Sequence, residues 1–167
     1  FPYTTLFRSS TLTRMHQIFP DVRMKQTYGL TELGAIRTKS KSSDSLWMKI
    51  GGDVHHQTKV VNGILYVRSD MAMLGYLNAE APFDEEGWYN TGDHVEVDGD
   101  YFLIQGRDCE RINVGGEKVY PADVECVLLS IEGVEDAAVV GVPNLILGQV
   151  VEARIYSNED QSLLTRS

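Results

Sequence analysis

The chain has 167 residues, of which 43% are hydrophobic and 23% are charged, a composition typical of a globular protein rather than a disordered one. Its formal net charge of −9 argues against a nucleic-acid surface, which needs a basic face. No apolar run approaches the roughly 18 residues that a membrane-spanning helix needs. The two cysteines, Cys109 and Cys126, have no Cys-x-x-Cys spacing, and no signal peptide precedes them. We therefore expect a reduced, cytoplasmic protein.

The first segment with a clear pattern is a short helix. Residues 1–10 show neither helical nor strand periodicity, and we interpret them as a non-native, adaptor-derived stretch. Over 11–19, apolar residues recur at helical spacing until Pro20 ends the run. Alternation over 22–27 then predicts a strand. This strand leads into Tyr28-Gly29-Leu30-Thr31-Glu32, which is either a ligand-facing turn or a strand–loop junction with a helix cap at its threonine.

Short strands joined by glycine turns follow. Residues 38–46 are rich in Ser, Lys and Asp and predict a surface loop. Asn62-Gly63 is a strong hairpin signal because both positions tolerate positive φ, and Asp98-Gly99-Asp100 predicts another hairpin. Such strands predict a small barrel or a curled sheet. His55 and His56 are strand neighbours that point to opposite faces, which argues against a metal site with two histidines.

The elements after residue 107 predict a compact β-β-α-β-β unit over 110–157. They are a hairpin around Gly115-Gly116, a helix from Pro121 to Gly133, an apolar strand over 137–142 and an alternating strand over 151–155. We expect the apolar strand to be buried on both faces and the alternating strand on one. The predicted fold class is therefore α+β, with a curled, barrel-like sheet before this unit.

Three positions between residues 89 and 125 carry the candidate chemistry. Asp93, on a tight glycine turn, can offer two carboxylate oxygens to a vicinal diol. Arg107, just after a strand, can bridge the same ligand to the next segment, because its planar fork binds pairs of oxygens. Gly115 and Gly116 let the backbone approach a narrow ligand without a side chain in the way. Their order and spacing predict a shared ligand site.

In this order, the motifs resemble those of the adenylate-forming superfamily, which includes acyl-CoA synthetases, peptide-synthetase adenylation domains and luciferases. The resemblance runs from about Met15 to Ile155 and rests on five ordered motifs: Tyr28-Gly29-Leu30-Thr31-Glu32, the segment Gly63-Ile64-Leu65-Tyr66-Val67 with Met73-Leu74-Gly75-Tyr76-Leu77, Thr91-Gly92-Asp93, Gly106-Arg107, and Gly115-Gly116-Glu117. It implies that residues 11–108 are the C-terminal part of an AMP-binding large domain. Residues 109–167 are then a truncated C-terminal small domain, so that both domains are incomplete.

The family makes an acyl adenylate from a carboxylate and ATP, then passes the acyl group to a thiol, commonly that of coenzyme A. By resemblance, Asp93 binds the ribose hydroxyls and Arg107 contacts the same region. The resemblance places Tyr28 and Gly29 against the adenine and the acyl pocket. Its catalytic candidates are Thr31, which would contact the phosphate, and Glu32, which would hold Mg²⁺, a hard cation that suits carboxylate oxygen. It also implies that Gly115 and Gly116 line the channel for the pantetheine arm.

The resemblance favours a fatty acyl- or aryl-CoA ligase over a peptide-synthetase module, on the stretch from Gly115 to Glu125. It implies a small-molecule carboxylate, ATP and coenzyme A as substrates. Two alternatives stay open: an acyl-AMP ligase that loads the thiol of an acyl carrier protein, and a non-catalytic binding remnant of the fold. The polar set favours an enzyme, since packing alone does not account for Thr31, Glu32, Asp93 and Arg107.

The sequence departs from the family pattern in three places. Cys109 stands at the hinge position, where the family usually has Asp or Lys, and a thiol cannot make the same charge-assisted bonds. The Ser/Thr/Gly-rich phosphate loop that would precede Tyr28 is not in the sequence. Neither is the lysine near the family's C-terminus, and Lys118 is in the wrong place to be that residue. We therefore expect a fragment that does not catalyse adenylation by itself.

Overall fold

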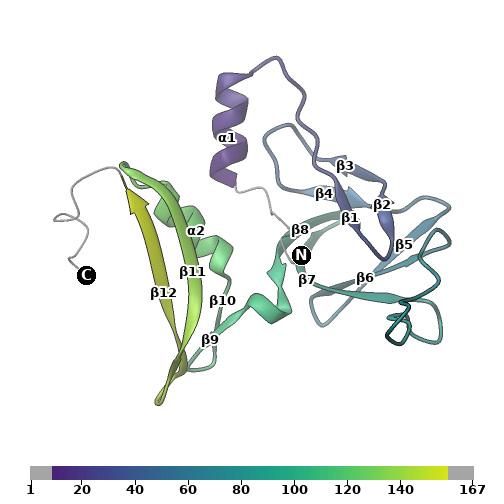
Figure 1. The fold of residues 1–167 in the computed structure, drawn as a ribbon. Helices are drawn as coiled ribbons and strands as arrows, with labels where there is room; N and C mark the ends of the chain where they lie inside the picture. The colour runs from purple at the N-terminus through teal and green to yellow at the C-terminus, as the bar shows by residue number, and fades with distance from the viewer. Residues whose placement is uncertain (1–8, 158–167) are drawn as a thin grey trace. The chain divides into compact units, whose positions relative to one another are not determined.

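The structure, a computed structural model, describes residues 9–157 (Figure 1). They pack as two compact units, one comprising Leu12–Gln105 and the other beginning at Gly106. The domain limits expected from the sequence, 11–108 and 109–167, place the change slightly later and stay a prediction. Neither helix of the described part is long and apolar enough to cross a membrane.

The helix α1 spans Ser9–Ile18, so the helix predicted over 11–19 is confirmed with an earlier start. The last two residues of the stretch assigned to an adaptor are therefore helical, and residues 1–8 lie outside the described part. That this stretch is non-native stays a prediction. The helix ends before Pro20, whose fixed φ and missing N–H cannot continue it.

The motif at 28–32 folds as a two-stranded hairpin, β1 (Tyr28–Leu30) and β2 (Gly34–Ile36), with Tyr28 opposite Ile36. Glycine is required at position 29, because a Cβ there would lie 2.9 Å from the Gly34 carbonyl oxygen. The alternative of a helix cap at Thr31 is wrong, since residues 31–33 form the turn between these strands.

The strand predicted over 22–27 is also wrong, and within this range the backbone of Gln26 makes its hydrogen bonds with side chains. The Gln26 amide donates to Ser40 Oγ at 2.9 Å, and the Gln26 carbonyl accepts from Thr38 Oγ1 at 2.8 Å. Strand formation needs a neighbouring backbone as partner. The regular strand therefore starts at Tyr28.

A six-stranded sheet, in the order β3-β4-β8-β7-β6-β5, forms most of the first unit (Figure 1). Its strands are β3 (Thr38–Ser40), β4 (Met48–Ile50), β5 (His56–Val61), β6 (Ile64–Ser69), β7 (Tyr89–Asp98) and β8 (Tyr101–Arg107). Both predicted hairpins are confirmed, and Asn62 and Gly63 have φ values of 52° and 79°. The surface loop predicted over 38–46 is partly wrong, because its first residues form β3, a short polar strand at the sheet edge.

One apolar core holds this curled sheet and the β1–β2 hairpin together. Along β6, Leu65 and Val67 are fully buried and alternate with more exposed residues, as expected for a strand with one face on the core. The core contains Tyr28, Leu33, Ile36, Met48, Ile50, Leu65, Val67, Val95 and Phe102. Since Tyr28 belongs to it, the hairpin that carries the first motif is fixed to the sheet that carries Asp93.

The second unit has the predicted β-β-α-β-β order. A 3₁₀ turn, η1 (Asp108–Glu110), precedes β9 (Ile112–Val114), β10 (Glu117–Val119), α2 (Pro121–Leu129), β11 (Val134–Asn144) and β12 (Gly148–Ser157). These strands form one sheet in the order β10-β9-β12-β11. Gly115 and Gly116 make the predicted hairpin turn between β9 and β10. The helix ends at Leu129 rather than running to Gly133.

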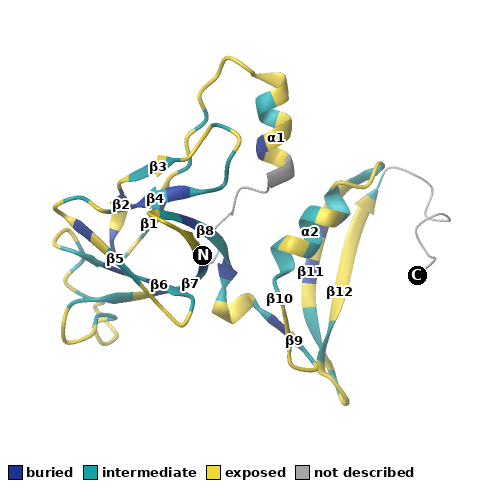
Figure 2. Ribbon diagram, turned by 180° about the vertical axis from the view of Figure 1, so that it is seen from behind, coloured by how far each residue is buried: buried dark blue, intermediate teal, exposed yellow. Residues whose placement is uncertain are grey.

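Two burial predictions for this unit are wrong. Ala137 and Val139 of β11 are buried, but Ala138 and Val140 between them are exposed, so this apolar strand is covered on one face only. Most of β12 is exposed as well, including the alternating residues Val151, Ala153 and Ile155 (Figure 2). The reason is that the single helix α2 packs against β11. The apolar composition of these strands therefore predicted more buried strand faces than this unit has.

Candidate functional site

Asp93 lies in a β-bulge within β7 rather than on a turn before a strand. Tyr66 of β6 pairs with Asn90 of β7, whereas Ile64 pairs with His94, so β7 has extra residues at this point. Gly92, with φ 71°, supplies the left-handed conformation that a side chain would disfavour. Bulges redirect side chains, and Asp93 here is only 1% exposed.

A buried hydrogen bond joins Asp93 to Tyr28. The Tyr28 hydroxyl donates to Asp93 Oδ2 at 2.5 Å, across 65 positions of sequence. Thr91 Oγ1 accepts from the Asp93 amide at 3.1 Å and donates to the Leu65 carbonyl at 2.8 Å, which fastens the bulge to β6. Because burying a carboxylate is costly unless it is hydrogen-bonded, the Tyr28 hydroxyl stabilises Asp93 in this position. The sequence predicted both residues for one nucleotide but not their contact.

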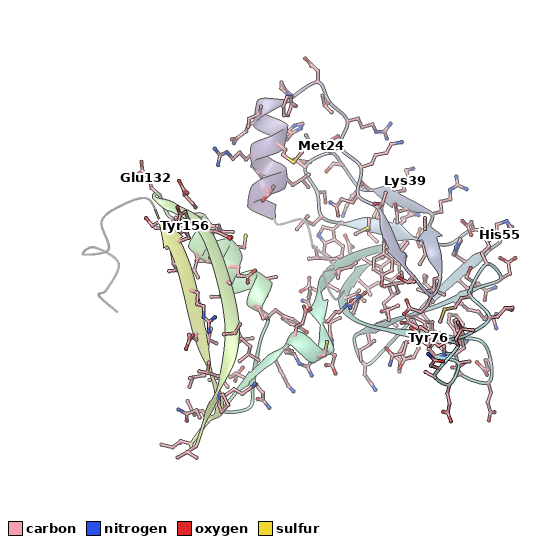
Figure 3. The ribbon with its side chains drawn as sticks, in the orientation of Figure 1. Met24, Lys39, His55, Tyr76, Glu132 and Tyr156 are labelled. Carbon is pink, nitrogen blue, oxygen red and sulfur yellow. The ribbon has the colours of Figure 1, made fainter. Side chains whose placement is uncertain are left out.

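Glu32, in the turn of the β1–β2 hairpin, is held by the loop that follows β6. The Met73 amide donates to the Glu32 carbonyl at 2.9 Å, and the Tyr76 hydroxyl donates to Glu32 Oε1. This hydrogen bond to the carboxylate raises the pKa of Tyr76 above its usual value. Thr31 beside Glu32 is exposed. Sequence reasoning gave Tyr76 no role, although its place in the Gly75-Tyr76 motif was the available signal (Figure 3).

The second unit carries the other predicted site residues. Arg107 ends β8, and Cys109 lies exposed in η1 as a free cysteine. An ion pair closes this turn, with Arg111 Nη2 at 2.8 Å from Asp108 Oδ1. The position predicted as the hinge therefore lies in a short, charged 3₁₀ turn, where backbone angles can change without breaking a strand ladder.

The Gly115-Gly116 turn lies beside the turn between β11 and β12. The Gly115 amide donates to the Leu147 carbonyl at 2.9 Å, and Asn113 Oδ1 accepts from the Gly116 amide at 3.1 Å. A Cβ on Gly115 would lie 3.1 Å from Leu147 Cδ2, while a Cβ on Gly116 would meet nothing within 4 Å. Both glycines have positive φ, 59° and 102°. Gly115 thus allows a close approach of two turns, and Gly116 leaves open space.

The described residues contain no cluster of three or more His, Cys, Asp or Glu side chains that could hold a metal ion. His55 and His56 pair with separate carboxylates: Nδ1 of each lies 3.0 Å from Asp70 Oδ2 and Asp53 Oδ1, respectively. Mg²⁺ is usually bound by one or two carboxylates, with waters and substrate phosphates completing its shell. Glu32, a half-buried carboxylate in a tight turn, fits that mode of binding.

Comparison with known proteins gives the class to which the chain belongs. No family model matches it. The 2-succinylbenzoate–CoA ligase of Enterococcus faecalis is 33% identical over 156 residues, covering 83% of this chain and 32% of that protein. The 4-coumarate–CoA ligase-like 2 of Arabidopsis thaliana is 36% identical over 165 residues, covering 87% of this chain and 29% of that protein. The chain thus spans about a third of the length of these relatives.

A solved enzyme structure with the same fold also matches this chain. The amide bond synthetase McbA of Marinactinospora thermotolerans superposes with a TM-score of 0.72 at 25% identity, covering 93% of this chain and 36% of that one. The curled sheet and the small α+β unit therefore have the fold of the matching part of that enzyme, and the predicted fold class is confirmed. The chain belongs to the adenylate-forming superfamily. The relatives reported above are both named as CoA ligases.

Proposed function

We propose that this protein is an ATP-dependent carboxylate–CoA ligase, which activates a carboxylic acid as an acyl adenylate and transfers the acyl group to the thiol of coenzyme A. The hydrogen bond between Tyr28 and Asp93 carries the proposal. The family resemblance assigns these residues, from two separate motifs, to one nucleotide. Two motifs that serve one ligand have to meet in space, and these two do.

In the proposed site, Asp93 accepts hydrogen bonds from the ribose hydroxyls, and Tyr28 and Gly29 lie against the adenine and the acyl pocket. The Asp93 carboxylate is 1% exposed, so ribose binding requires its surroundings to move. Arg107 acts at the same ribose from the end of β8. An arginine suits this role because its planar fork binds pairs of oxygens.

Thr31 and Glu32 are proposed for the phosphates. The exposed Thr31 hydroxyl contacts a phosphate oxygen, and Glu32 supplies a carboxylate to Mg²⁺. When bound, Mg²⁺ neutralises charge on the phosphates that leave as pyrophosphate. Because the chain contributes a single carboxylate at this turn, we expect cation binding to depend on the nucleotide.

Coenzyme A is the proposed acyl acceptor, since the relatives are named as CoA ligases. Gly115 and Gly116 line the path of the pantetheine arm. The turn at Cys109 is the hinge about which the small domain rotates between adenylation and acyl transfer. An acyl carrier protein is the alternative acceptor, and a non-catalytic binding protein is the alternative to an enzyme. We further propose that the protein acts in the cytoplasm and that these 167 residues alone do not complete adenylation.

Carboxylate-dependent ATP–pyrophosphate exchange tests the proposal, using the product of the complete open reading frame that encodes this chain. We expect exchange with one class of carboxylate, and its loss in Asp93→Asn and Glu32→Gln variants that keep the wild-type circular dichroism spectrum. Acyl transfer is then measured to coenzyme A and to a phosphopantetheinylated carrier protein, which separates the two acceptors. No exchange across a broad carboxylate panel would favour the binding protein. The same assay on the 167-residue chain tests its proposed inactivity.

A further inference from the structure

We infer that Tyr76 is a positioning residue, which orients the Glu32 carboxylate for the cation that accompanies ATP. The inference rests on the proposed function, because that function makes Glu32 the carboxylate at the cation. It adds a residue to the site for which neither the resemblance nor the sequence supplied a role. Tyr76 belongs to the loop after β6 (Figure 3), 44 positions along the chain from Glu32 in its hairpin.

The loop after β6 holds Glu32 at two points. The Met73 amide donates to the Glu32 carbonyl at 2.9 Å, which fixes the backbone of the turn. The Tyr76 hydroxyl donates to Oε1, which fixes the end of the side chain. A glutamate has three rotatable side-chain bonds, and ordering them costs conformational entropy. Because the backbone and the carboxylate of Glu32 are both hydrogen-bonded, this entropy is already lost on folding rather than on ligand binding.

The contribution of Tyr76 is its hydroxyl rather than its ring. The side chain is 46% exposed and lies outside the apolar core of the first unit, so burial of the ring does not explain its place. A phenol is a neutral donor, which orients a carboxylate without adding positive charge beside a cation. Outer-shell donors of this kind hold metal-binding side chains in a productive orientation.

The experiment uses Mn²⁺ in place of Mg²⁺ and follows free Mn²⁺ by electron paramagnetic resonance. The complete gene product is titrated in the presence of α,β-methylene-ATP, which cannot release pyrophosphate. We expect Tyr76→Phe to weaken Mn²⁺ binding about tenfold, the lower end of the usual cost of losing an outer-shell partner. Its affinity for the analogue without metal should stay at the wild-type value.

Tyr66→Phe is the matched control. Tyr66 is another tyrosine of the first unit, half-buried where Tyr76 is exposed, and its hydroxyl accepts from Asn90 Nδ2 at 3.1 Å, away from Glu32. It should leave both affinities unchanged. Tyr76→Leu removes the same donor with a different side chain and replaces Tyr76→Phe if that variant does not fold.

The outcomes distinguish a failure of the role inferred for Tyr76 from a failure of the role proposed for Glu32. Wild-type Mn²⁺ affinity in the Tyr76 variants overturns the inference, and so does an equal loss of metal-free nucleotide binding, which a general structural role would cause. If Glu32→Gln binds Mn²⁺ as the wild type does, the proposed role of Glu32 fails. In that case the role of Tyr76 fails with it.

Discussion

Tyr28 and Asp93 form a buried hydrogen bond between two different sheets. Tyr28 belongs to the two-stranded hairpin sheet, and Asp93 belongs to the six-stranded sheet. The bond therefore joins these sheets and also holds the carboxylate proposed for the ribose. We therefore expect stability and the proposed nucleotide binding to be linked at this one contact.

Removing the Tyr28 hydroxyl should destabilise the first unit. Tyr28→Phe keeps the buried ring but takes one donor from a buried carboxylate, which typically costs about 1–3 kcal/mol. The free energy of unfolding, from urea denaturation, measures this loss. Tyr66→Phe, which removes a more exposed hydroxyl, should cost less, and equal losses in the two variants would contradict the assigned role of the Tyr28 bond.

The Glu125 side chain connects α2 to β11 through a hydrogen bond to the strand backbone. Its Oε1 accepts from the Val139 amide at 2.9 Å, so Glu125→Ala leaves a strand amide without this acceptor. We expect a loss of about 1–2 kcal/mol in unfolding free energy. Glu125→Gln keeps a carbonyl acceptor and should lose less than half of that. The exposed Glu132→Ala is the surface control, and a loss there equal to that of Glu125→Ala would reject this explanation.

Leu65 is expected to be among the most sensitive positions of the first unit. It is 0% exposed in the core, so Leu65→Ala should cost about 2–5 kcal/mol through lost burial and the cavity left behind. Leu74, in the loop after β6, is fully exposed, and Leu74→Ala should change stability by no more than about 0.5 kcal/mol. Thermal unfolding of both variants compares them. A large loss for Leu74→Ala would show that its side chain is buried in solution.

His55 provides a pH-dependent contribution to stability. Its hydrogen bond to Asp70 raises its pKa above the ordinary 6.5, because the carboxylate favours the protonated ring. A raised pKa in the folded state means that the contribution is fully present below the unfolded-state pKa. It is lost as pH rises through the folded-state pKa.

NMR titration of the His55 ring tests this assignment. In Asp70→Asn, the pKa of His55 should fall toward the ordinary value, and the same variant should remove the contribution of His55 to the pH dependence of the unfolding free energy. The ring of His94, in β7, serves as the internal reference. An unchanged His55 titration in the variant would disprove the pairing.

The local elements of the fold could be predicted from short sequence signals. Asn62-Gly63, Asp98-Gly99-Asp100 and Gly115-Gly116 each specify a turn because their residues tolerate positive φ, and the structure has a hairpin at each. Pro121 likewise marked the start of α2. These signals act over a few residues, so they do not depend on the rest of the chain.

The wrong predictions concern features that depend on contacts with distant parts of the chain. Alternation over 22–27 indicated a strand, but the side chains of Thr38 and Ser40 take the backbone hydrogen bonds of Gln26. The burial of β11 and β12 depends on what covers them, which their own composition does not state. Of the site, the motif residues were identifiable one by one. The partnerships of Asp93 with Tyr28 and of Glu32 with Tyr76 were not, because they join residues 65 and 44 positions apart.

The bulge at Gly92 lets β7 redirect one side chain of the candidate site without ending the sheet. On either side of it, β7 keeps its pairing with β6, so the strand ladder continues past the bulge. Side chains in a regular strand alternate strictly between faces, and any change of direction there would shift all later residues. The bulge confines such a change to a few residues. A redirected side chain at Asp93 and a regular ladder on both sides of it therefore coexist in one strand.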